Sequence, residues 1–230
     1  MECKNAGLYH PSYERDACGI GFVANIKGRK SHQILSDALT ILENMEHRGA
    51  CGCESNTGDG AGLMVQMPHE FFFDECVKLG LHLPAYGRYG VGVLFFPKDI
   101  ALREAGREIF NRSAEKLGLE VLAYRKVPVN PQGIGPTALS VEPEMEQVFI
   151  ACPDQLRDSE AFERKLFVLR NYASHTINNT VKESPTGFYI ASLSYKTVVY
   201  KGQLTSHQLR GYFPDLSDKR MTSAFGLIHS

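Results

Sequence analysis

Cys18 is the residue of this chain whose setting most directly raises a question of chemistry. It lies in YERDACGIGF (residues 13–22), where charged and turn-forming residues precede the thiol and a short apolar run with two glycines follows. A cysteine in such a place is a packing residue, a metal ligand or a nucleophile. Spacing and composition alone favour packing, because a cysteine beside a strand is usually inert.

Two other patterns near the N-terminus do not support a bound metal or nucleotide. Cys51 and Cys53 are one residue apart and no second pair exists, whereas zinc sites usually combine two pairs with wider spacing. We therefore expect free loop thiols and no metal site, with Cys3, Cys76 and Cys152 isolated or in the core. The run GIGFVA (19–24) matches a relaxed dinucleotide fingerprint, but it lacks a preceding strand and a helix that begins inside it.

Two polar segments downstream are further candidates. In EHRGA (46–50), His47 and Arg48 close a predicted helix, and capping of its C-terminal dipole is the simplest interpretation from the residues alone. TGDGAG (57–62) resembles a phosphate-binding turn but lacks the lysine and hydroxyl residue of a P-loop. A tight turn with positive φ angles and the wall of a pocket remain equally open interpretations of this loop.

The elements around these motifs predict an α+β fold. Helical spacing predicts helices from Ser31 to about His47, from His69, from Asp99 to Lys116 and from Ser159 to Ile177. Strands are expected at 19–26, which we predict to be buried, and at 62–67, 89–96, 120–127, 146–152, 187–194, 196–202 and 223–230. Several strands follow one another closely, so sheets flanked by helices fit better than a parallel doubly wound sheet.

Composition sets broad limits on function. The chain has 230 residues, of which 43% are hydrophobic, and its formal net charge is −1. Without a clustered basic face, nucleic acid and anionic membranes are not expected partners. No signal peptide and no long apolar run are present, so a cytoplasmic enzyme is expected. Six cysteines are too few for a disulfide scaffold.

Several motifs in the same order resemble one family. DACGIGF (16–22), EHRGA and TGDGAG resemble the start of the large chain of glutamate synthases. The later stretches SLSYKTVVYKGQL (192–204), YFPDLSD (212–218) and TSAFGLIHS (222–230) agree with it. The resemblance runs from about Leu8 to Ser230, and its separate motifs make it specific.

This resemblance implies a class II glutamine amidotransferase domain at residues 18–230, an N-terminal-nucleophile hydrolase with a four-layer αββα core. Residues 1–17 would be a propeptide, and Cys18 the catalytic nucleophile that hydrolyses glutamine to glutamate and ammonia through a thioester. The base would be the terminal α-amine freed by cleavage, since such an amine has a pKa of about 7.7–8.0. Arg48, Gly58 and Asp59 would belong to the substrate-binding site.

The same resemblance places the redox chemistry elsewhere. In complete glutamate synthases ammonia is passed to 2-oxoglutarate for glutamate biosynthesis and nitrogen assimilation. FMN and an iron–sulfur cluster are expected in the oxidoreductase domains absent from this chain, which itself would carry no cofactor. The remaining synthase domains, a small subunit or ferredoxin are the expected partners beside glutamine.

The sequence departs from the pattern of this family at its C-terminal end. In the family an arginine for the glutamine carboxylate follows the HS pair, and a later Asn-Gly pair forms the oxyanion hole. Because this sequence stops at Ser230, we expect a C-terminally incomplete domain that is inactive alone. Two alternatives remain. One is another class II amidotransferase, of the amidophosphoribosyltransferase or asparagine synthetase type, although the YKG and DLSD segments argue against it. The other is a non-catalytic remnant that only folds or docks.

Overall fold

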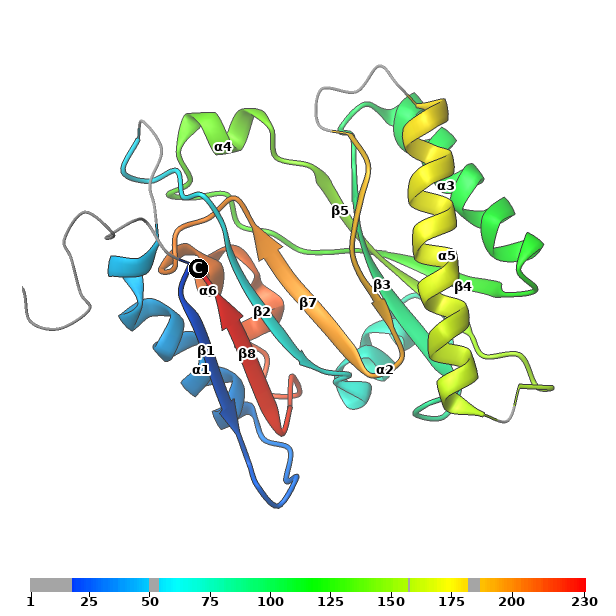
Figure 1. The fold of residues 1–230 in the computed structure, drawn as a ribbon, viewed down its shortest axis with the longest axis horizontal. Coiled ribbons are helices and arrows are strands. Elements are labelled where there is room, and N and C mark those ends of the chain that lie inside the picture. Colours follow the sequence, from blue (N-terminus) through cyan, green and yellow to red (C-terminus); the bar gives the residue numbers. More distant parts are fainter. Residues whose placement is uncertain (1–17, 50–53, 157, 182–186) are drawn as a thin grey trace, which may run out of the picture.

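The part of the chain that the structure describes is built on two antiparallel sheets of four strands each (Figure 1). The computed structural model describes residues 18–49, 54–156, 158–181 and 187–230. The first sheet has the order β1 (Ile20–Ala24), β8 (Phe225–His229), β2 (Ala61–Gln66), β7 (Thr197–Gly202). The second sheet has the order β4 (Glu120–Lys126), β5 (Glu144–Ala151), β3 (Tyr89–Phe96), β6 (Tyr189–Ser194).

Helix α1 (His32–Asn44) lies on the first sheet. As the sequence predicts, the Ser31 side chain caps it by accepting a hydrogen bond from the amide of Ile34. The helix can approach β8 closely because residue 226 is glycine: a Cβ there would lie 2.5 Å from the Cβ of Ala38. The helix ends somewhat earlier than the predicted position near His47. It ends at Asn44, and the chain continues through a 3₁₀ turn, η2 (Glu46–Arg48).

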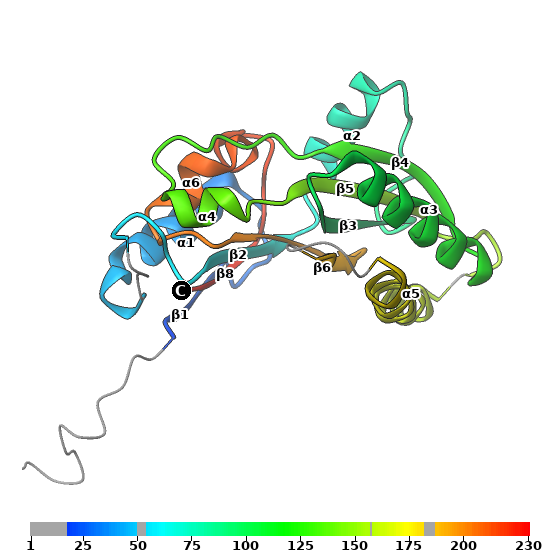
Figure 2. The ribbon, with the colours of Figure 1, turned by 90° about the horizontal axis from the view of Figure 1, so that it is seen from above.

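The remaining helices belong to the second sheet and to the connections. They are α2 (His69–Lys78), α3 (Ile100–Lys116), α4 (Pro136–Ser140), α5 (Ser159–Thr180), α6 (Gln208–Tyr212) and the 3₁₀ helix η3 (Pro214–Ser217). Helices α3 and α5 lie side by side at the second sheet (Figure 1), and α5 is on the opposite side of the strands from α1 (Figure 2). The predicted α+β class, with helices flanking antiparallel sheets, is confirmed.

Alternate residues of the second sheet serve two hydrophobic cores. Val93 of β3 and Phe149 of β5 pack into a cluster shared with α1, α2 and the first sheet. Their neighbours Leu94 and Val148 face the other way, into a cluster formed with α3 and α5. Both faces of β3 and β5 are therefore buried, which explains the continuous apolar run of β3 and the apolar second half of β5.

Strand β1 differs from its prediction. We expected a buried strand, but Ile20 is 68% and Phe22 63% exposed. The reason is its place at the edge of the first sheet, with its outward face uncovered by any described helix. Its inward face is tight: a Cβ at Gly21 would lie 2.6 Å from the Ile228 side chain. Glycine at this position thus lets β1 pair with β8 without displacing the core.

Two strands that follow each other in the sequence lie in different sheets. β6 ends at Ser194 and β7 begins at Thr197, yet β6 pairs with β3 and β7 with β2. The Ser194 hydroxyl accepts hydrogen bonds from the amides of Lys196 and Thr197, at 2.9 and 3.3 Å, which fixes the turn between the sheets. In the part of the chain that the structure describes, no helix is long and apolar enough to cross a membrane.

Candidate active site

Cys18 lies at the end of the first sheet where β1 begins and β8 ends. Gly19 and Ser230 exchange two backbone hydrogen bonds, of 2.7 and 2.8 Å, which continue the pairing of β1 with β8. Cys18 is the next residue beyond this pair, and its side chain is exposed. The pairing of the strands therefore fixes the backbone beside the thiol while leaving the thiol accessible.

The other described cysteines are unsuited to nucleophilic chemistry. Cys76 and Cys152 are buried, as the sequence predicts. Burial raises the pKa of the Cys76 thiol to about 12 and also raises the pKa of Cys152. Because the thiolate is the nucleophilic form, both are poor nucleophiles near neutral pH. Cys3, Cys51 and Cys53 fall outside the described residues.

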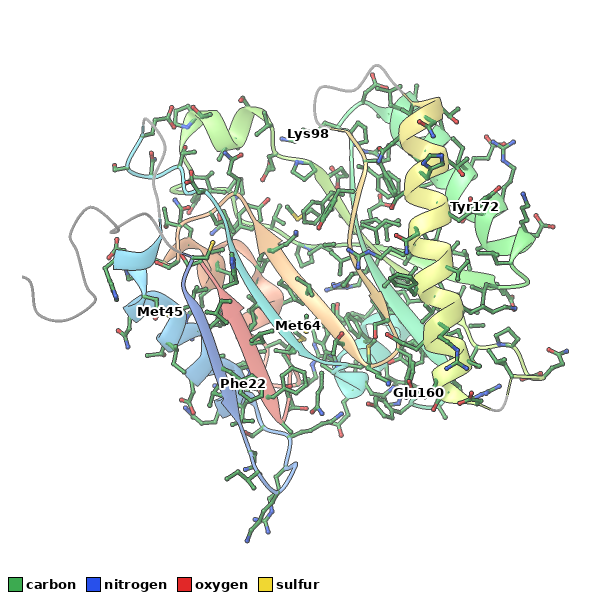
Figure 3. All side chains as sticks on the ribbon, in the orientation of Figure 1. Phe22, Met45, Met64, Lys98, Glu160 and Tyr172 are labelled. Atoms are coloured by element: carbon green, nitrogen blue, oxygen red, sulfur yellow. The ribbon has the colours of Figure 1, made fainter. Side chains whose placement is uncertain are left out.

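A cavity of about 920 Å³ opens beside Cys18. This is at the upper end of the range typical for small-molecule sites. Its floor is the outward face of the first sheet, where Leu227 pairs with Met64 and Met64 pairs with Val199. Figure 3 shows Phe22 and Met64 on this sheet, on the side away from α1. The cavity thus combines an apolar floor with the exposed thiol at its edge.

The loop TGDGAG forms part of the cavity wall, which is one of the two interpretations left open by the sequence. The other, a tight turn with several positive φ angles, is wrong in that only Gly60 of this loop has one. Asp59 and Gly60 line the cavity, and Gly60 has a φ of +149°, which favours glycine. Gly58 is buried and packs against backbone: a Cβ there would lie 2.5 Å from the Thr205 amide and would also overlap the Leu204 carbonyl. Of the two predicted residues, Asp59 therefore faces the cavity and Gly58 allows the loop to approach residues 204–205.

Arg48 belongs to a turn that lies beside the same end of the sheet. A Cβ added to its neighbour Gly49 would lie 2.8 Å from the Ser230 hydroxyl, so the chain after Arg48 passes next to the β1–β8 pair. The carboxylate of Glu46 in the same turn accepts a hydrogen bond from His207 at 3.0 Å. The interpretation of His47 and Arg48 as C-terminal caps is wrong, because α1 ends before them and has no basic residue in its last turn.

Polar residues from distant segments complete the cavity wall, and the sequence did not predict them. Lys201 donates a hydrogen bond to the Tyr189 hydroxyl at 2.8 Å. Tyr212 donates to Glu142 at 2.8 Å, and burial, followed by this contact, raises the pKa of Tyr212, which stays a neutral donor. Lys201 and Tyr212 lie in the YKG and YFPDLSD stretches, but only the folded sheets bring these stretches to one cavity.

Of the two motifs considered for metals or nucleotides, Cys51 and Cys53 fall outside the described residues and GIGFVA lies within them. Among the described positions, no group of three or more His, Cys, Asp or Glu residues is arranged to hold a metal ion. GIGFVA forms the edge strand β1 rather than the turn into a helix that a dinucleotide fingerprint needs.

Comparison with known proteins agrees with the motifs. The family model described as glutamine amidotransferases class-II matches residues 18–230. The chain is 44% identical to the glutamate synthase [NADPH] large chain of Bacillus subtilis, covering 99% of this chain and 14% of that protein. It is 43% identical to the glutamate synthase [NADH] of Schizosaccharomyces pombe, with 99% and 11% covered.

A plant relative gives the same result. The ferredoxin-dependent glutamate synthase 2 of Arabidopsis thaliana is 38% identical, with 94% of this chain and 13% of that protein covered. The chain thus spans 11% to 14% of the length of these relatives. The resemblance carried by the motifs is confirmed over nearly the whole chain: it belongs to the class II glutamine amidotransferases and is similar to the amidotransferase region of glutamate synthases.

Proposed function

We propose that, within a complete glutamate synthase, this chain is the glutaminase domain, which hydrolyses glutamine to glutamate and ammonia with Cys18 as the nucleophile. One observation carries the proposal. Cys18, the first residue matched by the amidotransferase family, is an exposed thiol at the edge of a cavity large enough for an amino acid. Membership of the family supplies the reaction class, and the accessible thiol supplies the group to perform it.

In the proposed reaction the Cys18 sulfur attacks the side-chain amide carbon of glutamine. A carbon–sulfur bond forms, the carbon–nitrogen bond breaks, and the amide nitrogen leaves as ammonia after receiving the thiol proton. Water then attacks the γ-glutamyl thioester, which releases glutamate and restores the thiol. The α-amine of Cys18 carries the proton in both steps once residues 1–17 have been removed. A positioned base of this kind is typically worth about 10² to 10⁴ in rate.

The cavity wall suggests roles for the other predicted residues. The Asp59 carboxylate faces the cavity and can pair with the α-ammonium group of glutamine. Arg48 belongs to the turn η2, and its neighbour Gly49 passes next to Ser230, so the substrate-binding role proposed for Arg48 rests on the place of this turn. Gly58 contributes indirectly, because its missing side chain lets the loop hold Asp59 at the cavity.

The whole protein's reaction extends this proposal. Ammonia would pass to 2-oxoglutarate in other domains, with FMN and an iron–sulfur cluster bound there. Iron–sulfur clusters need several cysteine thiolates together, and the described residues of this chain offer no such group. The relatives' names specify NADPH, NADH or ferredoxin, so the electron donor, and with it a small subunit or ferredoxin as partner, depends on the parts outside this chain.

A trapping experiment tests the proposal. The protein that carries this chain is mixed with glutamine, quenched in acid within a turnover, and digested for mass spectrometry. We expect a γ-glutamyl adduct on a peptide that begins at Cys18, with none in the Cys18→Ala variant or in a sample given glutamate. An adduct on another residue, or an active enzyme that still carries Asp16 and Ala17, would contradict the assignment.

A further inference from the structure

The loop that carries Gly58 and Asp59 is held in place by two side chains outside the proposed catalytic group. The carboxylate of Glu54 receives hydrogen bonds from the hydroxyl of Thr57 at 2.7 Å, the hydroxyl of Thr137 at 2.8 Å and the amide of Thr137 at 3.2 Å. These bonds, with that of Thr57 first, lower the pKa of Glu54. Glu54 therefore ties the start of the loop to α4 as a carboxylate.

Gln208 makes a second connection from the opposite side. Its amide nitrogen donates to the carbonyl oxygens of Asn56 and Gly133, both at 2.8 Å. Its amide oxygen accepts from the Thr205 amide, also at 2.8 Å. One side chain at the start of α6 thus joins the loop, the turn before α4 and the segment after β7, and uses both donors and its acceptor.

Backbone contacts also hold the loop close to the turn before α4. The Gly135 amide donates to the Asn56 carbonyl at 2.9 Å. A Cβ on Gly135 would overlap the Thr57 hydroxyl and lie 2.5 Å from the Glu54 carboxylate. Together with the contact of Gly58 on Thr205, these approaches leave little space for the three segments to move apart. The beginning of β2, α4 and α6 lie together on one side of the molecule (Figure 2).

All three segments reach the rim of the cavity that contains Cys18. The loop contributes Asp59, the turn before α4 contributes Ile134, and the segment after β7 contributes Leu204. Glu54 and Gln208 do not line the cavity themselves. Their contacts therefore set the position of Asp59 relative to Cys18 without supplying a group to the reaction.

We infer that Glu54 and Gln208 are positioning residues that determine affinity for glutamine through the loop at residues 54–60. This inference rests on the proposed function, because it takes glutamine as the occupant of the cavity. Substitutions at either residue are expected to weaken glutamine binding, while the chemistry at Cys18 and the use of free ammonia stay unchanged. A residue that only stabilised the fold would lower all activities together with stability.

The test compares Gln208→Leu and Glu54→Gln with a control in the same helix. Arg210 is a suitable control, because its side chain ties α6 to Glu43 and Ser36 of α1 rather than to the loop. In the protein that carries this chain, KM and kcat for glutamine, activity with ammonium and thermal stability are measured for each variant. Cys18→Ala is included to test the proposed function independently.

We expect Gln208→Leu and Glu54→Gln each to raise the KM for glutamine about tenfold or more, since each breaks bonds and leaves polar partners unpaired. The kcat and the ammonium activity should stay within about twofold, and Arg210→Met should leave KM unchanged. An unchanged KM in both loop variants, or an equal rise in KM in Arg210→Met, would overturn the inference. If Cys18→Ala kept its glutamine activity, the proposed function would fail instead.

Discussion

Replacing Asp215 should destabilise the protein strongly, because Asp215 is the main partner of a buried guanidinium. Arg125 and Asp215 are both buried and form two hydrogen bonds, of 2.8 and 2.9 Å. Asp215 also accepts from the Tyr200 hydroxyl at 2.9 Å, and Arg125 donates to Gln147 at 2.8 Å. This network joins β4 and β5 of the second sheet to β7 of the first.

The size of the stability loss depends on how well the buried Arg125 guanidinium is still paired in Asp215→Ala. Removing one partner of a buried ion pair typically costs about 3–5 kcal/mol. Glu75 stays 3.2 Å from the Arg125 guanidinium and compensates for part of the charge. We therefore expect the lower end of that range, a loss of about 3 kcal/mol in the free energy of unfolding.

Urea denaturation and thermal unfolding measure this loss. For a chain of this size about 3 kcal/mol corresponds to a fall in Tm of roughly 6–12 °C. A double variant, Arg125→Met with Asp215→Leu, removes both charges and should recover much of the stability. A loss below about 1 kcal/mol for Asp215→Ala would refute the view that this pair is desolvated and joins the two sheets.

Two smaller changes test other parts of the structure. Gly58→Ala should destabilise by about 1–3 kcal/mol, because its methyl group would overlap the backbone at residues 204–205, whereas Gly211→Ala should not, since nothing lies within 4 Å of the added Cβ; equal unfolding free energies for the two variants would contradict this. Asp218→Asn tests pH dependence. The hydrogen bond from Arg220 lowers the folded-state pKa of Asp218, so its contribution is present above the unfolded value of about 3.9 and disappears as pH falls through the folded value. The variant should be less stable than the parent near neutral pH, and the two stabilities should converge in acid. If denaturant titrations gave the same difference in unfolding free energy at every pH, the proposed contribution of the Asp218–Arg220 pair would be contradicted.

Local sequence patterns predicted those helices and strands that depend mainly on their own residues. β3 occupies the predicted residues 89–96, and Ser31 caps α1 as expected. Helices α4 and α6 have five residues each, too few for a helical period to show. The exposure of β1 could not be predicted from its apolar residues, because it depends on pairing with β8 more than 200 residues away.

The site shows the same division between local and distant information. Cys18 and the loop around Asp59 stand out as motifs because their residue types are unusual at those positions. Lys201, Tyr189 and Glu142 line the cavity with them, but they come from β7, β6 and the segment before β5, and no spacing in the sequence links them. The role of Gly58 depends on a contact with Thr205 that only the folded chain reveals.

Paired assays of the Cys18→Ala variant test the central claim most directly. In the glutamate synthase proposed to contain this chain, glutamate formation is measured with glutamine and, separately, with ammonium as the nitrogen source. The account predicts that the variant loses the glutamine-dependent reaction and keeps the ammonium-dependent one, because free ammonia does not require the thioester. Retained activity with glutamine, or equal loss of both activities, would contradict the assignment of Cys18 as the nucleophile.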